Sequence, residues 1–151
     1  MNSVLKKRVS LFVLILWMCF IFYMSGMNGV ESKMISSSFV MTISKILNVN
    51  DSYLFISQYE LLFRKIAHVS EYFILCLLLY NYLKYIVISN KIYLYSAVIS
   101  SIYSISDEFH QSFISGRGST YIDVLIDMVG ICLALIIIIV FKIYASKRKS
   151  N

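Results

Sequence analysis

The chain has 151 residues, 59% of them hydrophobic, and a net charge of +6 at pH 7. A soluble domain of this length has too little interior to bury so much apolar surface, so the composition argues against a soluble domain and predicts a protein of the cell membrane. The basic excess does not indicate nucleic-acid binding, because the sequence contains no nucleic-acid motif.

The basic residues predict which side of the membrane each segment faces. Nine of them lie in the N-terminal tail, in one central segment and at the C-terminal end: Lys6, Lys7, Arg8, Lys84, Lys91, Lys142, Lys147, Arg148 and Lys149. All eight acidic residues lie elsewhere. Lysine and arginine accumulate on the cytoplasmic side of membrane proteins, so this pattern places both termini in the cytoplasm.

Counting from the basic clusters predicts four membrane-crossing helices. A helix needs about 20 residues to cross the hydrocarbon layer, which places the helices at about 9–28, 64–83, 92–111 and 122–141. The first follows the stretch KKR, as in a signal peptide, but MSGMNG after it offers no small-x-small cleavage site, so we interpret it as an uncleaved anchor. The expected fold is all-α: a single domain over residues 1–151, forming an integral, multi-pass bundle of four helices in the cell membrane.

The segment 29–63, between the first two predicted helices, is too charged and too rich in serine to cross the membrane. Its apolar residues recur at near-helical spacing, at Ile35, Phe39, Ile43, Ile46 and Leu47, with Ser36, Ser37 and Lys45 on other faces. This pattern predicts an amphipathic helix on the outer membrane surface. Such a helix could be a simple connector or a lid over the residues beneath it.

The second predicted helix carries polar residues near its outer end. In the stretch RKIAHVSEY, Lys65, His68 and Glu71 follow one another at steps of three, with Tyr72 adjacent. Residues three or four apart share a helical face, so we expect one polar stripe.

The third and fourth predicted helices carry similar stripes at a similar depth. Ile92–Ser106 covers only 15 residues, too few to cross comfortably, so the third helix must include the polar stretch DEFHQ. The fourth helix carries Asp123 and Asp127, four residues apart. Each unpaired charge in lipid costs about 3 kcal/mol, so the stripes should face one another. The sequence therefore predicts a polar pocket that opens toward the outer leaflet.

The order of these polar residues resembles the VanZ-like membrane proteins. The pattern there is K-x-x-H-x-x-E-Y, then D-E-x-H-Q-x-F, an arginine a few residues later, and D-x-x-x-D-x-x-G. The matching positions here are Lys65, His68, Glu71, Tyr72, Asp107, Glu108, His110, Gln111, Phe113, Arg117, Asp123, Asp127 and Gly130. The resemblance covers about residues 9 to 140. The family takes its name from a protein that gives low-level resistance to teicoplanin, a glycopeptide antibiotic with a lipid tail, so the resemblance implies a link to the cell envelope and to glycopeptide susceptibility.

The pocket predicts chemistry on a membrane lipid or a lipid-linked envelope molecule, with a glycopeptide antibiotic as a further candidate partner and no role for nucleic acid. The candidate catalytic residues are His68, Glu71, Asp107, Glu108, His110, Asp123 and Asp127, because imidazole–carboxylate pairs serve general acid–base catalysis. The candidate substrate-binding residues are Lys65, Tyr72, Gln111 and Arg117, which offer cationic and polar contacts for an anion.

Several alternatives to an enzyme stay open. The pocket could bind or shield a head group without turnover, or the polar residues could form a structural network that holds the helices together. The spacings His-x-x-Glu and Asp-x-x-His also occur in helical metal sites, but spacing alone supports that interpretation, so the sequence assigns neither a metal nor another cofactor. Transport is the weakest alternative, because no polar stripe continues toward the cytoplasmic ends.

Overall fold

The computed structural model describes residues 2–150, leaving aside the side chains of Lys149 and Ser150, and these residues form five α-helices and no strand. The helices are α1 (Ser3–Ser25), α2 (Gly29–Ile46), α3 (Ser52–Leu83), α4 (Ile92–Gln111) and α5 (Tyr121–Ser150). The all-α class predicted from the sequence is therefore confirmed.

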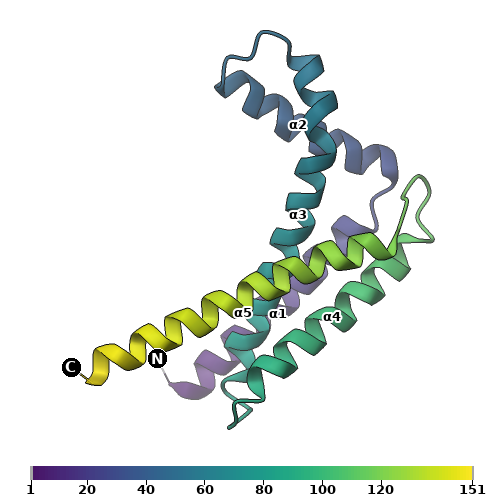
Figure 1. The fold of residues 1–151 in the computed structure, drawn as a ribbon. Helices are drawn as coiled ribbons and strands as arrows, with labels where there is room; N and C mark the ends of the chain where they lie inside the picture. The colour runs from purple at the N-terminus through teal and green to yellow at the C-terminus, as the bar shows by residue number, and fades with distance from the viewer. Residues whose placement is uncertain (1, 151) are drawn as a thin grey trace.

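Helix α3 organises the structure, because it packs against each of the other four helices. Its second half lies among α1, α4 and α5, and the apolar core forms there around Leu14, Tyr72, Leu75 and Ala134. Both termini and the α3–α4 loop lie at one end of this group of helices, with the α4–α5 loop at the other end (Figure 1). The placement of the termini in the cytoplasm stays a prediction.

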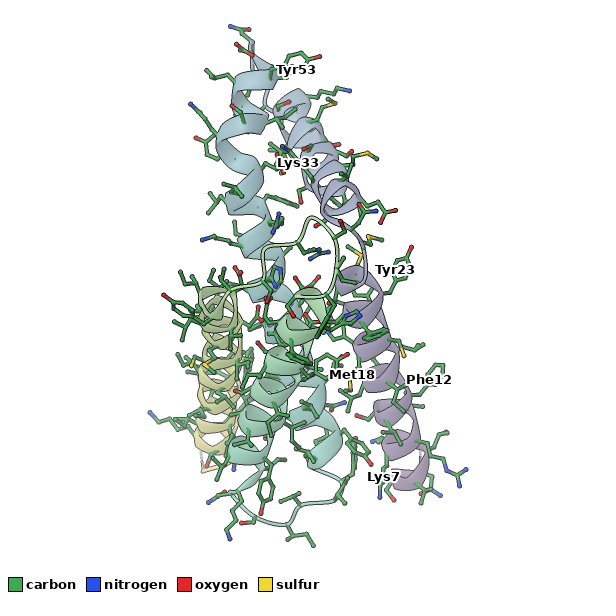
Figure 2. The ribbon with its side chains drawn as sticks, turned by 90° about the vertical axis from the view of Figure 1, so that its right-hand side faces the viewer. Lys7, Phe12, Met18, Tyr23, Lys33 and Tyr53 are labelled. Carbon is green, nitrogen blue, oxygen red and sulfur yellow. The ribbon has the colours of Figure 1, made fainter. Side chains whose placement is uncertain are left out.

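Two helices are long and apolar enough to cross a membrane, at Ser3–Ser25 and Tyr121–Arg148. In the most apolar 18-residue stretch of each helix, only 22% and 28%, respectively, is buried, whereas a core helix of a soluble protein would be mostly buried. Phe12 and Tyr23 of α1, for example, point away from the other helices (Figure 2). These exposed apolar faces support a membrane location, while crossing by α3 and α4 stays a prediction.

The helix bounds agree with the predicted ones in one case and extend beyond them in others. Helix α4 has the bounds expected for the third helix. Helix α3 begins at Ser52 instead of near residue 64, because Asp51 caps it and no glycine or proline interrupts the chain before Leu83. Counting from basic residues locates an apolar segment and does not locate the helix end. Helix α1 begins earlier, at Ser3, and α5 continues to Ser150.

Helix α2 coincides with the predicted amphipathic segment but buries a different face. A capping box between Asn28 and Glu31 starts it, and it runs beside the first half of α3 as a helical hairpin that extends beyond the other helices (Figures 1 and 2). Its buried residues are Ser32, Ser36, Val40 and Ser44, spaced four apart. Small side chains allow two helices to approach closely, so the serines face α3. Ser36 lies on a different face from the apolar stripe, as expected, but it is this serine face that is buried, while much of the apolar stripe, including Ile46, is exposed.

Candidate functional site

A cavity of about 250 Å³ lies among α1, α2, α3 and α4. Polar side chains from all four helices and the α4–α5 loop line it: Ser25, Ser32, Ser36, Arg64, His68, Glu71, Asp107, Gln111 and Arg117. Large apolar side chains from α1, α2 and α3 also line it: Phe20, Ile21, Met24, Ile35, Phe39 and Phe63. The cavity therefore combines charged and apolar side chains, and residues of α2 line it, while the choice between a connector and a lid stays open.

Helix α3 presents Arg64, His68 and Glu71 to the cavity, while Lys65 is exposed and does not line it. At 3.6 residues per turn, side chains four and seven residues apart stay aligned, whereas two successive steps of three drift around the helix. His68 and Glu71 are four and seven residues from Arg64, but Lys65 and Glu71 are six apart. Of the predicted stripe, His68 and Glu71 line the cavity. The cation beside them is Arg64 and not the predicted Lys65.

Helix α4 turns the first, second and last residues of DEFHQ inward. Asp107, Glu108 and Gln111 are buried, and Gln111 Nε2 donates to Asp107 Oδ2 at 3.0 Å. The same face carries the buried serines Ser100 and Ser104, which let α4 pack closely. The polar stretch therefore continues a face of small polar side chains.

Arg117 fixes the α4–α5 loop onto the end of α1. Its Nε donates to the Met27 carbonyl oxygen at 3.0 Å, Nη2 to that of Met24 at 2.6 Å, and Nη1 to Gln111 Oε1 at 3.1 Å. These acceptors are neutral, and among the described residues no carboxylate forms an ion pair with Arg117. Burial lowers the pKa of the Arg117 guanidinium, with the positive charge of Arg64 acting in the same direction. The positive charge is thus positioned without an anionic partner.

A pair of glycines brings this loop against the start of α2. The Gly29 N–H donates to the Ser115 carbonyl oxygen at 3.0 Å, and a Cβ on Gly29 would stand 2.0 Å from the Gly116 oxygen. Gly116 has a φ of 74°, a conformation that suits glycine. The contact joins the α4–α5 loop directly to the start of α2.

His110 lies outside the cavity, contrary to the expectation that both imidazoles share it. Its ring stacks on Phe22 with centroids 4.6 Å apart, and its Nδ1 shares a hydrogen bond of 3.3 Å with Ser25 Oγ. It lines a more open hollow of about 990 Å³ between α1 and α2. His110 is three residues from Asp107, and this angular offset is enough to turn it toward α1.

Asp127 contacts His68 on the side away from the cavity. His68 Nδ1 lies 3.3 Å from Asp127 Oδ1, and Ser104 Oγ donates to Asp127 Oδ2 at 2.7 Å. Asp127 is fully buried. Asp123, one turn earlier in α5, is half-buried and accepts a hydrogen bond from Thr120 at the start of the helix. The α5 carboxylates therefore lie behind the cavity wall, and their predicted place inside it is not what the structure shows.

The other two candidate residues are buried without lining the cavity. Tyr72 is a core residue whose hydroxyl has no hydrogen-bond partner among the described residues. Both carboxylate oxygens of Glu108 lack a partner as well, although the Glu108 backbone oxygen accepts from Ser119 Oγ at 2.7 Å. Both side chains face inward, as predicted, but away from the cavity.

Sequence reasoning missed two polar contributors, Arg64 and Ser104. Arg64 stands next to Lys65 in the stretch RKIAH, and testing the spacing of four and seven would have selected it. Ser104 belongs to the series Ser96, Ser100 and Ser104, whose spacing of four marks a helix-packing face. Both signals are present in the sequence.

Comparison with known proteins gives the family. The VanZ/LLP1 family model matches residues 10–142, which is most of the chain. No curated protein and no solved structure matches. The match includes all three polar stripes and the loop that carries Arg117. The chain therefore belongs to the VanZ/LLP1 family.

Proposed function

We propose that this VanZ/LLP1 family protein binds the polar head of an envelope lipid or lipid-linked molecule in the cavity among α1–α4. The observation that carries the proposal is the cavity itself, whose lining combines cationic and polar side chains with large apolar ones. An amphiphile matches both surfaces. We propose further that α3 and α4 cross the membrane with α1 and α5, that both termini are cytoplasmic, and that the cavity faces the outer leaflet.

The size of the cavity favours a head group over a whole lipid. At about 250 Å³ it falls below the range of about 300–1,000 Å³ that is usual for drug-sized ligands. The tails of a bound lipid would lie outside it, along the exposed apolar side chains of α2 such as Met34 and Met41.

The charges favour an anionic group such as a phosphate. Arg64 and Arg117 both line the cavity, and a guanidinium carries more N–H donors than the three neutral acceptors of Arg117 occupy. Arginine binds phosphate oxygens through paired hydrogen bonds. The nearby carboxylates Glu71 and Asp107 would select a head group that also carries hydroxyl or amino donors.

A second candidate function is acid–base modification of that molecule. His68 lines the cavity, and its ring is backed by the Asp127 carboxylate at 3.3 Å, while Glu71 lies on the same side. A positioned imidazole with a neighbouring carboxylate can move a proton to or from a bound substrate. Binding and modification differ in whether the bound lipid changes.

The test is mass spectrometry of two samples. Protein purified in mild detergent should retain an anionic envelope lipid, and Arg117→Ala should lose it while still accumulating in the membrane. Lipid extracts of cells with and without the protein then separate the two functions: a new or depleted lipid species indicates modification, and an unchanged lipid profile indicates binding. Absence of any retained lipid from the purified parent protein would refute the proposal.

Susceptibility to teicoplanin gives a cellular readout. The lipid tail of this glycopeptide would meet the same apolar faces, and we propose that the protein lowers susceptibility through the lipid that it binds. Expression in a sensitive host should raise the inhibitory concentration of teicoplanin, and Arg117→Ala should remove that rise.

A further inference from the structure

We propose that His68, Glu108 and Asp127 form a binding site for a divalent transition-metal ion. The residues come from α3, α4 and α5, and each offers one ligand atom within 4.8 Å of the others. The proposal does not depend on lipid binding: His68 lines the cavity, but Glu108 and Asp127 do not, and the ion is detected without any lipid.

The ligand atoms are buried and lack partners. Asp127 is 0% exposed and Glu108 is 4% exposed. Asp127 Oδ1, both Glu108 carboxylate oxygens and His68 Nδ1 have no hydrogen-bond partner among the described residues. Although His68 Nδ1 lies 3.3 Å from Asp127 Oδ1, the two atoms are not aligned for a hydrogen bond. The Glu108 carboxylate has no side-chain partner and that of Asp127 has one donor, Ser104, on Oδ2. Burying two carboxylates with so few donors close together is costly.

A divalent cation resolves this arrangement. Its charge balances the two carboxylates, and one imidazole nitrogen with carboxylate oxygens is a ligand set typical of zinc and similar ions. Zinc lies about 2 Å from its ligands, so atoms on opposite sides of the ion are about 3–4 Å apart. The observed spread of up to 4.8 Å requires only a modest side-chain rotation. Three protein ligands leave a coordination position for water or substrate.

Neighbouring groups hold two of the ligands in place. Ser104 Oγ donates to Asp127 Oδ2 at 2.7 Å, which leaves Oδ1 directed toward His68. Ser119 Oγ binds the Glu108 backbone oxygen and anchors the end of α4 to the following loop. Such supporting contacts commonly change metal affinity by about 10- to 100-fold when they are removed.

The test uses purified full-length protein without a polyhistidine tag and with its cysteines blocked. After chelation, the protein is titrated with Zn²⁺, Mn²⁺ or Co²⁺ and measured by elemental analysis, thermal unfolding and, for Co²⁺, visible absorption. We expect about one equivalent of a tightly held ion and a rise in Tm on its addition. Glu108→Gln and Asp127→Asn should lose the ion, and Ser104→Ala should weaken its binding about tenfold.

The matched control is Glu60→Gln, a carboxylate on α3 outside the cluster, which should keep the parent's metal content and Tm shift. Binding by the parent that survives in folded Glu108→Gln protein would overturn the site. If the variants fail to fold, the parent decides: no bound ion and no Tm shift with any of the three metals refutes the proposal.

Discussion

Gly130 of α5 lies so close to α3 that a Cβ added to it would stand 2.1 Å from the Val69 carbonyl oxygen. His68 precedes Val69 in α3, and Asp127 lies less than one turn before Gly130 in α5. The close approach of the two backbones therefore brings the imidazole and the carboxylate to 3.3 Å. Gly130 is not itself a candidate site residue, but the close packing at Gly130 sets the distance between His68 and Asp127.

Gly130→Ala should force α5 away from α3. Overpacking of a tight contact costs about 1–3 kcal/mol, so we expect a lower Tm by circular dichroism in detergent. The matched control is Gly118→Ala, because nothing lies within 4 Å of a Cβ at Gly118. Equal melting of the two variants would show that α3 and α5 are not packed at Gly130.

Ser104→Ala should destabilise the protein by removing the donor to Asp127 Oδ2. A buried acceptor left without a partner costs about 1–3 kcal/mol. Ser106→Ala removes an exposed hydroxyl that bonds to Tyr103 one turn away, so its unfolding temperature should match that of the parent. A stable Ser104→Ala variant would mean that another donor reaches Asp127.

Arg64→Gln should reduce the retained lipid measured by mass spectrometry, and Lys65→Gln should not. The two residues are adjacent and carry the same charge, but only Arg64 lines the cavity. Both variants lose one positive charge, so any effect of net charge on lipid association is the same in both. A difference in retained lipid between them therefore reports the contribution of the cavity. The reverse order of effects would favour the stripe that contains Lys65.

Arg117→Lys should loosen the α4–α5 loop while keeping its charge. A lysine lacks the planar fork that reaches Met24, Met27 and Gln111 together. We expect faster hydrogen exchange over residues 112–120 and weaker lipid retention, with unchanged exchange in the core of α5. An unchanged exchange rate in the loop would show that these three hydrogen bonds do not hold it.

Single cysteines in a cysteine-free background distinguish four crossing helices from two. Ser38→Cys should react with an impermeant reagent added outside intact cells, whereas Ser89→Cys and Ser146→Cys should react only after lysis. If only α1 and α5 cross, Ser89 lies on the same side as Ser38 and both react together. The α3–α4 loop therefore decides the topology.

The sequence predicted where the helices lie better than it predicted which neighbouring helix each face contacts. Helix α4 has the expected bounds: it begins at Ile92, directly after Lys91, and its 20 residues match the length expected for a crossing helix. The inward direction of His68, Glu71 and Asp107 follows from the cost of charge in lipid. These are properties of single helices and their solvent.

The rest depended on how helices rotate against one another. His110 stacks on Phe22, and Asp127 contacts His68. Small residues such as Ser104 and Gly130 determine how closely the helices pack and how they are rotated against one another. The periodicity of one helix separates its faces but does not say which neighbouring helix each face contacts. The same holds for α2, whose serines face α3 although its apolar residues made the visible pattern.

The hydrogen bond from Gly29 to Ser115 makes α2 and the Arg117 loop a single mechanical unit. If the proposed lipid enters beneath α2 and displaces its first turn, that displacement would pull on the loop whose Arg117 guanidinium is bonded to Met24 and Met27. Displacement of α2 would therefore also move the Arg117 guanidinium that is proposed to bind the head group. An anion bound to Arg117 would in turn oppose the displacement of α2. Tighter binding of the head group would therefore also slow its release.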